Sequence, residues 1–249
     1  MLRVKSAILA GVISTLCAAT TFAEFDVVPF VSNGKIFANA HNDGTNEDVN
    51  NVSVFGYEFG EDSLDPYFIG DPGFNSLGGT ALPFPSNLNL KVVSDLKYWD
   101  GIGSVSLSAA PNGESLFLKK GSFSISIGSG TAVPLSLTIQ PVDSLGGVHS
   151  HIESFLYSSD DEAVPNDGND ATAGIYFLQA ALSSSSPSIT DSDPLWFVFN
   201  NGLSETQLNA AMSAVPEPSS IVLGMFAAGS LVTYLRRERS RTRRRSNLS

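Results

Sequence analysis

Short apolar segments separated by turn-forming residues dominate the chain between residues 26 and 200. In 122–127, Phe123, Ile125 and Ile127 alternate with serines. Alternate residues of a strand face opposite sides of a sheet, so this pattern predicts a strand with one buried face. Gly, Pro, Asn or Asp bound the further predicted strands: 52–59, 88–94, 103–108, 115–118, 133–139, 152–157, 175–182 and 195–199. This spacing predicts a mostly β domain, built as an antiparallel, jelly-roll-like β-sandwich, with a short helix at 203–213.

Charge is distributed unevenly along the chain. The stretch 24–215 contains five lysines, no arginine and 23 acidic residues, so its formal charge is −18. Such a surface repels nucleic acid and anionic lipid, and it attracts divalent cations. The one cysteine, Cys17, lies outside this stretch, so no disulfide stabilises the domain and its stability must come from its core.

The N-terminus has the pattern of a signal peptide. Arg3 and Lys5 precede an apolar segment of small residues, and Thr21-Phe22-Ala23 supplies small residues at the −3 and −1 positions of a cleavage site. We therefore expect residues 1–23 to be a signal peptide that is cleaved after Ala23, which leaves an acidic extracytoplasmic domain at 24–213. The alternative is an uncleaved membrane anchor, which the shortness of the apolar segment disfavours.

The C-terminal segment, 214–249, combines three features. Pro216-Glu217-Pro218 is followed by an apolar run, and seven arginines lie between Arg236 and Arg245. With its flanking serines, the run at 219–235 is long enough for one membrane-spanning helix, and the basic tail at 236–249 is expected on the cytoplasmic side.

This arrangement of tripeptide, apolar helix and basic end resembles the sorting signal of PEP-CTERM proteins. The resemblance implies an exported protein that is held in the membrane and then processed by an exosortase. It also implies that Pro216, Glu217 and Pro218 are the residues recognised by that enzyme. The alternative is an ordinary single-pass anchor. The tail is longer and more basic than is usual in the family.

The domain itself resembles blocks found in exported proteins, many of which carry the same tail. This resemblance implies a discrete domain at about 24–215 and no particular reaction. It rests on four segments: 59–68, 71–75, 95–101 and 191–196.

The segment Val148-His149-Ser150-His151-Ile152-Glu153 is the strongest candidate for a metal site. On a strand, His149, His151 and Glu153 would share one face. Two imidazoles and a carboxylate suit zinc or another divalent transition metal. His41 is the remaining histidine of the chain and could complete the site across the sheet. The alternative is a pair of solvated histidines, and a cupin is disfavoured because its second histidine motif is missing.

Two other binding hypotheses follow from composition. Acidic loops could supply the six to eight oxygens that calcium prefers, although Asp-Gly and Asp-Pro also simply mark turns. These loops contain Glu58, Glu61, Asp62, Asp65 and Asp71, then 160–162, 167–170 and 191–193. Four aromatic residues could form a sugar-stacking platform or belong to the core: Tyr57, Tyr98, Trp99 and Trp196.

No catalytic motif stands out in the sequence. The domain lacks cysteine, a nucleophile elbow, a phosphate loop and a dinucleotide fingerprint. We therefore expect a non-catalytic protein of the cell surface or extracellular matrix that binds a metal or another ligand, with exopolysaccharide or matrix as the partner. The alternative is a secreted hydrolase that uses a metal or a pair of carboxylates, for example on glycans.

Overall fold

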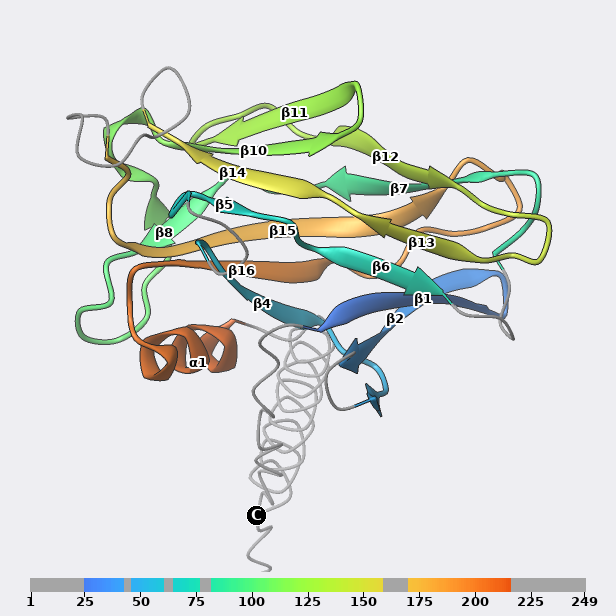
Figure 1. Ribbon diagram of the computed structural model, residues 1–249, viewed down its shortest axis with the longest axis horizontal. Helices are drawn as coiled ribbons and strands as arrows, with labels where there is room; N and C mark the ends of the chain where they lie inside the picture. The colour runs from blue at the N-terminus through green and yellow to red at the C-terminus, as the bar shows by residue number, and fades with distance from the viewer. Residues whose placement is uncertain (1–24, 43–45, 61–64, 77–81, 159–169, 216–249) are drawn as a thin grey trace, which may run out of the picture.

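Sixteen strands in three sheets, followed by one α-helix, form the described part of the chain (Figure 1). The computed structural model describes residues 25–42, 46–60, 65–76, 82–158 and 170–215. The five-stranded sheet has the order β13-β6-β1-β2-β3. Its strands are β1 (Asp26–Ser32), β2 (Lys35–Asn42), β3 (Glu47–Val49), β6 (Gly73–Ser76) and β13 (Val148–His151).

The other two sheets complete the β-structure. The four-stranded sheet has the order β11-β10-β14-β5, with β5 (Phe68–Ile69), β10 (Ser115–Lys120), β11 (Phe123–Gly128) and β14 (Glu153–Tyr157). The seven-stranded sheet follows the order β12-β7-β15-β16-β4, and β8 and β9 extend it beside β15. Its strands are β4 (Val54–Glu58), β7 (Asn87–Val92), β8 (Lys97–Trp99), β9 (Ser108–Ala109), β12 (Leu135–Pro141), β15 (Gly174–Ser184) and β16 (Leu195–Asn201). A 3-10 turn, η1 (Pro111–Gly113), precedes β10.

The main core lies between the seven-stranded sheet and a layer formed by the other two sheets (Figure 1). Period-2 alternation turns one set of apolar side chains from each strand inward, where burial contributes about 1.5–3 kcal/mol for each large side chain. All three sheets contribute fully buried residues to one cluster, including Val27, Ile36, Phe74, Leu116, Leu118, Leu156, Leu88, Tyr176 and Phe197. The sandwich therefore has a continuous interior to which all three sheets contribute.

Helix α1 (Glu205–Ala214) covers part of the other face of the seven-stranded sheet. Leu208 and Met212 pack with Trp99, Phe177 and Trp196 in a second apolar cluster. At the N-terminus of the helix, the backbone N–H of Ser204 donates to Gln207 Oε1 at 3.0 Å, which completes a capping box. The helix predicted at 203–213 is thereby confirmed.

The mostly β prediction is confirmed, but a purely antiparallel sandwich is wrong. Strand β1 runs parallel to β6, and β4 runs parallel to β16. Hairpin turns impose antiparallel pairing only on strands that are neighbours in sequence, and these partners are far apart along the chain.

The strand predicted at 103–108 is also wrong. Ile102 is 77% exposed and Gly103 has φ +69°, so this segment leaves the sheet before β9 begins.

The predicted signal peptide with Ala23, the Pro216–Pro218 tripeptide, the apolar run at 219–235 and the basic tail lie outside the described residues. Within the described residues, no helix is long and apolar enough to span a membrane.

Candidate functional site

One extended run, 148–157, positions the histidines by crossing from one sheet to another. β13 belongs to the five-stranded sheet and β14 to the four-stranded sheet. Between them, the backbone N–H of Ile152 donates to the Pro72 carbonyl at 3.1 Å. Val148, Ser150 and Ile152 are buried, whereas His149 and His151 are exposed and Glu153 is half-buried. The three candidate ligands therefore lie on the outer face of the molecule.

The four side chains proposed from the sequence have different polar partners. The rings of His149 and His151 lie edge to face with centroids 5.9 Å apart. Glu153 Oε2 accepts a hydrogen bond from Lys119 Nζ at 2.7 Å. His41 Nδ1 lies 2.7 Å from Asp48 Oδ1, between β2 and β3. The structure thus brings the two neighbouring histidines together, but it places Glu153 and His41 against other groups.

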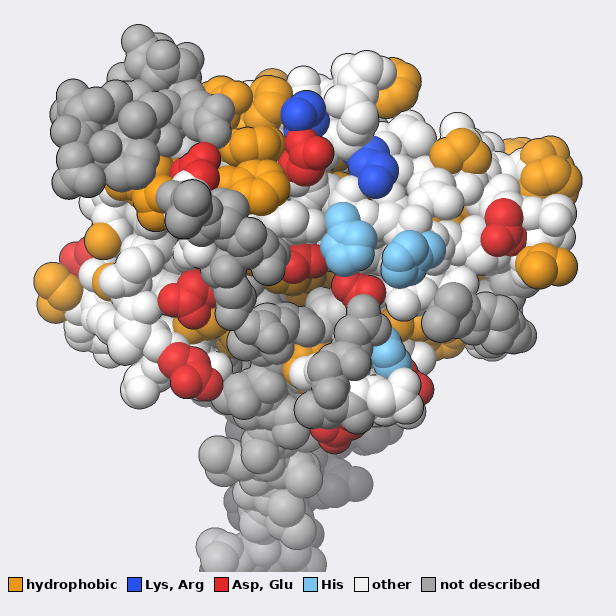
Figure 2. Space-filling view, viewed as in Figure 1, with side chains coloured by type: hydrophobic (Ala, Val, Ile, Leu, Met, Phe, Trp, Pro, Cys, Tyr) orange, Lys and Arg blue, Asp and Glu red, His pale blue; other side chains and the backbone are white. Residues whose placement is uncertain are grey.

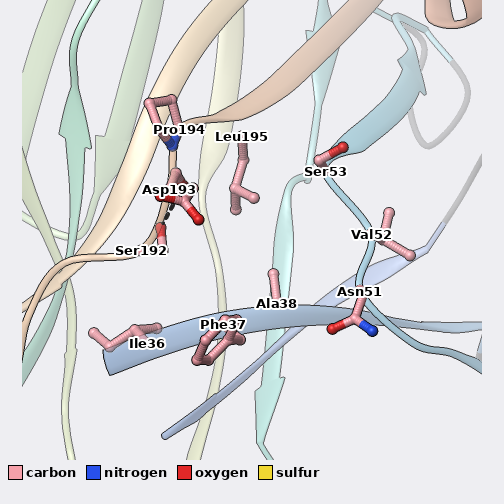
Figure 3. Close-up of a pocket in the computed structure, with 10 residues that line it drawn as sticks. All are labelled: Ile36, Phe37, Ala38, Asn51, Val52, Ser53, Ser192, Asp193, Pro194 and Leu195. Atoms are coloured by element: carbon pink, nitrogen blue, oxygen red, sulfur yellow. Dashed lines mark hydrogen bonds between the residues drawn. The ribbon is translucent and has the colours of Figure 1, made fainter. Parts of the chain in front are cut away.

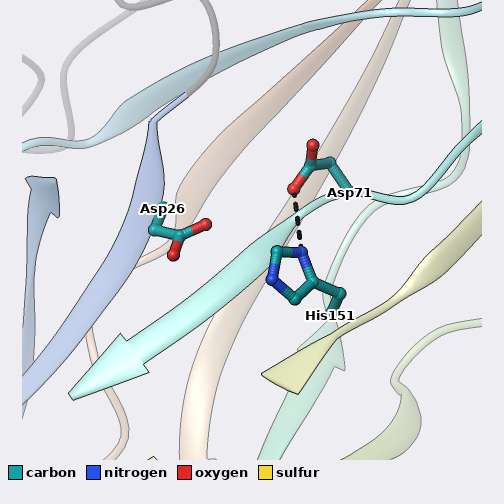
Figure 4. A group of neighbouring side chains, drawn as sticks. All are labelled: Asp26, Asp71 and His151. Atoms are coloured by element: carbon teal, nitrogen blue, oxygen red, sulfur yellow. Dashed lines mark ion pairs between the residues drawn. The ribbon is translucent and has the colours of Figure 1, made fainter. Parts of the chain in front are cut away.

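A different set of ligand atoms converges on the same face. One ligand atom from each of Asp26, Asp71 and His151 lies within 4.8 Å of the other two. His151 Nδ1 is 3.4 Å from Asp71 Oδ1, and Figure 4 shows the imidazole and the two carboxyl groups arranged as a triangle. Asp26 is buried, Asp71 is partly exposed and His151 is exposed. We call this group the Asp–Asp–His cluster.

Strand register explains why these three side chains meet. Val27 pairs with Phe74 across the parallel β1–β6 ladder, and both side chains point into the core. The flanking Asp26 and Gly73 therefore face outward. His151 pairs directly with Gly73 across the β6–β13 ladder. Asp71 lies just before β6, and its carbonyl accepts a hydrogen bond from Ser154 Oγ at 2.5 Å.

Gly73 leaves the space in which Asp26 and His151 approach each other. A Cβ at this position would lie 1.8 Å from Asp26 Oδ1 and 2.9 Å from His151 Cε1. Both contacts are shorter than atoms can tolerate, so a larger residue would displace the carboxylate, the imidazole or both. The observed positions of Asp26 and His151 therefore require glycine at position 73.

The two carboxylates also act on the interior beneath them. Burial raises the pKa of the Tyr57 phenol well above its ordinary value, and the charges of Asp71 and Asp26 raise this pKa further. Tyr57 lies on β4 in the opposite layer, and its hydroxyl is 3.5 Å from the Phe25 carbonyl. The cluster therefore makes a negative potential that extends into the core, where screening by water is weak.

The polar face around the cluster holds all three histidines. Figure 2 shows their side chains on one side of the molecule with acidic side chains among them. Asp26 pairs with His41 in the β1–β2 register, and His41 in turn contacts Asp48. Asn75, opposite His149 on β6, is 6% exposed, and its Oδ1 has no hydrogen-bond partner in the described part of the chain.

A second carboxylate has a very different environment. Glu114, 1% exposed, accepts hydrogen bonds from Thr172 N at 2.7 Å, Thr172 Oγ1 at 2.6 Å and the Tyr176 hydroxyl at 2.5 Å. Desolvation raises the pKa of Tyr176 strongly, and the hydrogen bond to Glu114 and its charge raise this pKa further. Through these hydrogen bonds Glu114, which follows η1, links this part of the chain to Tyr176 on β15. Glu114 therefore has a structural role in the interior.

A pocket of about 240 Å³ opens beside β2 and the start of β16 (Figure 3). Its lining is largely apolar, including Ile36, Val52 and Leu195. Asp193 is the ionisable group among its described lining residues, and it is paired with Lys35 at 2.7 Å. Its polar lining residues are Asn51, Ser53, Ser192 and Asp193, and Ser53 Oγ has no hydrogen-bond partner in the described part of the chain.

The proposed sugar-stacking platform is wrong. Its four aromatic side chains are 8% exposed or less because they face the two apolar clusters: Tyr57, Tyr98, Trp99 and Trp196.

The acidic loops are partly occupied by other contacts. Asp191 pairs with Lys91 at 2.8 Å, and Asp193 pairs with Lys35. Asp170 accepts a hydrogen bond from the Tyr67 hydroxyl at 3.1 Å, and Asp65 accepts one from the Tyr67 backbone N–H at 2.9 Å. Glu61, Asp62, 160–162 and 167–169 lie outside the described residues.

Comparison with known proteins adds information about the C-terminal segment. A family model described as the PEP-CTERM protein-sorting motif matches residues 214–240. The chain carries a PEP-CTERM sorting motif. This match confirms the resemblance inferred from Pro216-Glu217-Pro218 and its surroundings, and it supports an exosortase-sorted exported protein. The match begins at the residue where α1 ends, so the PEP-CTERM motif follows the described domain directly. No curated protein and no solved structure matches the chain.

Proposed function

We propose that this PEP-CTERM protein is a non-catalytic binding protein of the cell surface or extracellular matrix. The observation that carries the proposal is the sorting motif at 214–240, which directly follows the β domain. In this account a signal peptide is cleaved after Ala23, the apolar run at 219–235 holds the protein in the membrane, and an exosortase recognises Pro216, Glu217 and Pro218. The domain is then displayed outside the membrane, where it meets exopolysaccharide or matrix.

Fractionation with mass spectrometry of the mature protein tests this routing. We expect an N-terminus at Glu24 and a C-terminus processed near the PEP-CTERM motif, in the membrane or extracellular fraction. Glu217→Ala should leave the protein membrane-bound with its tail intact. Glu238→Ala, which changes an acidic residue outside the tripeptide, is the matched control and should be processed normally. A full-length cytoplasmic product that begins at Met1 would contradict the proposal.

The binding role is favoured over hydrolysis by the placement of the acidic groups. Glu114 is enclosed by hydrogen-bond donors, and the Asp–Asp–His cluster lies on an outer sheet face and does not line the described pocket. A screen of the exported protein against glycans, esters and peptides separates the two classes. Turnover that Asp71→Asn or His149→Ala abolishes would replace our proposal with a secreted metal- or carboxylate-dependent hydrolase.

A further inference from the structure

We propose that Asp26, Asp71 and His151 bind one divalent transition metal ion, with zinc as the first candidate. The ligands come from the first residue of β1, the segment before β6 and the last residue of β13. This inference goes beyond the surface role proposed above and is independent of how the protein is sorted. It also assigns ligands that differ from the His149–His151–Glu153 set expected from the sequence.

The spacing of the ligand atoms fits a small ion. In a tetrahedral site with bonds of about 2.0–2.2 Å, neighbouring ligand atoms are about 3.4 Å apart. The distance between His151 Nδ1 and Asp71 Oδ1 already has this value, at 3.4 Å. All three ligand atoms lie within 4.8 Å of one another, so modest side-chain rotations bring them to one ion.

The donor set selects the class of metal. Two carboxylate oxygens and one imidazole nitrogen are ligands that zinc and similar divalent ions accept, and three protein ligands leave a position for water. Calcium prefers six to eight oxygen ligands, so an imidazole among so few ligands disfavours it. The formal charge of −18 over 24–215 adds a long-range attraction that any cation experiences.

Two observations outside the three ligands support a site made for an ion. Gly73 lies between Asp26 and His151, and a Cβ there would collide with both side chains. Asn75 is two residues further along β6 on the same face, and its buried Oδ1 has no hydrogen-bond partner in the described residues. An amide oxygen without a donor costs free energy, and a nearby cation or metal-bound water relieves that cost.

The neighbouring His149 provides a matched control. It lies on the same strand and face as His151, two residues away, and is similarly exposed, but it is not in the Asp–Asp–His cluster. Glu153 lies two residues beyond His151 and is paired with Lys119. Variants at His149 and Glu153 therefore change the same kinds of group without touching the proposed ligands.

Calorimetric titration of the chelator-stripped full-length protein with zinc chloride tests the site. We expect one equivalent of zinc to bind to the wild type, His149→Ala and Glu153→Gln with similar affinity. Asp71→Asn and His151→Ala should each weaken binding at least tenfold. Circular dichroism of every variant separates loss of a ligand from loss of the fold, and Asp71→Asn preserves side-chain shape.

Three results would overturn the assignment. Equal zinc uptake by all variants would show that diffuse acidic charge holds the metal. Loss of binding in His149→Ala and Glu153→Gln, with His151→Ala also affected, would return the site to the set expected from the sequence. Absence of stoichiometric binding by the folded wild type would remove the site altogether.

Discussion

Glu114 and the Asp–Asp–His cluster show two ways in which this acidic domain holds carboxylates in its sheets. Glu114 is nearly inaccessible and is surrounded by donors from Thr172 and Tyr176. At the cluster, Asp26, Asp71 and His151 direct their ligand atoms at one another. The first arrangement stabilises a carboxylate by hydrogen bonds within the protein, whereas the second concentrates electron-pair donors at one point.

This difference separates a structural group from a candidate site. A buried carboxylate with donors for its oxygens stabilises the fold, and its replacement leaves those donors unsatisfied. Two carboxylates that lie close together repel each other, and a cation bound between them removes that repulsion. Substitutions at the two places should therefore have opposite consequences for stability and for metal binding.

The largest effect is expected from Glu114→Gln. The neutral amide replaces charge-assisted hydrogen bonds from Thr172 and Tyr176 with weaker ones, and the Tyr176 hydroxyl must then donate to the Thr172 carbonyl, 2.7 Å away, and accept from the amide N–H. We expect the free energy of unfolding to fall by about 3 kcal/mol, with zinc affinity unchanged in the folded fraction. Urea denaturation measures the loss. Glu153→Gln, on the surface, is the control and should change stability by less than about 0.5 kcal/mol. A similar loss in both variants would remove the distinction.

Gly73→Ala should have the next largest effect. Its Cβ would meet Asp26 Oδ1 at 1.8 Å, so we expect a loss of about 1–3 kcal/mol and the loss of zinc binding. Gly128→Ala is the control because its Cβ would have ordinary contacts, the nearest at 3.5 Å from the Glu114 carbonyl oxygen. Thermal unfolding with and without zinc measures both quantities. Undisturbed zinc binding in Gly73→Ala would show that Asp26 is not a ligand.

Tyr176→Phe should change how the free energy of unfolding depends on pH in alkaline solution. The folded-state pKa of Tyr176 is raised, so folding retains a proton that the unfolded chain releases above about pH 10. The stabilisation is fully present below pH 10 and is lost as pH rises toward the folded pKa. Above about pH 10 the free energy of unfolding should therefore fall less steeply with pH in the variant than in the wild type. The two slopes should differ by about 1.4 kcal/mol per pH unit. Identical slopes in denaturation between pH 10 and 11 would contradict this.

The smallest effect is expected from Asp71→Asn in the metal-free protein. Neutralising Asp71 removes its repulsion with Asp26 but also weakens its contact with His151 Nδ1 at 3.4 Å, so the two effects oppose each other and stability should stay within about 1 kcal/mol of the wild type. Zinc should raise the unfolding temperature of the wild type and leave that of the variant unchanged. A metal-free loss as large as that of Glu114→Gln would mean that Asp71 is also a structural group.

Local pattern predicted most of the elements but not their partners. The alternation in 122–127 and the apolar run at 175–182, with its aromatic start, predicted strands that the structure has as β11 and β15. Alternation is typical of a sheet with one buried face, and a continuous apolar run is typical of a strand buried on both faces. The parallel pairing of β1 with β6 joins segments that are distant in sequence, and no local signal specifies it.

The candidate site was only partly accessible from the sequence for the same reason. His151 was found because His-x-His places two imidazoles on one strand face. In the sequence Asp71 is one of several acidic loop residues, and no local pattern distinguishes Asp26 as a ligand. Both become partners of His151 through register around Gly73, and that register is a property of the assembled sheet.

Anomalous diffraction from zinc-loaded crystals of the protein is the most direct test of the difference between the two carboxylate environments. The account predicts one strong zinc peak about 2.0–2.2 Å from ligand atoms of Asp26, Asp71 and His151, and none at Glu114. A peak bound by His149 and Glu153, or a folded protein with no zinc on this face, would contradict it.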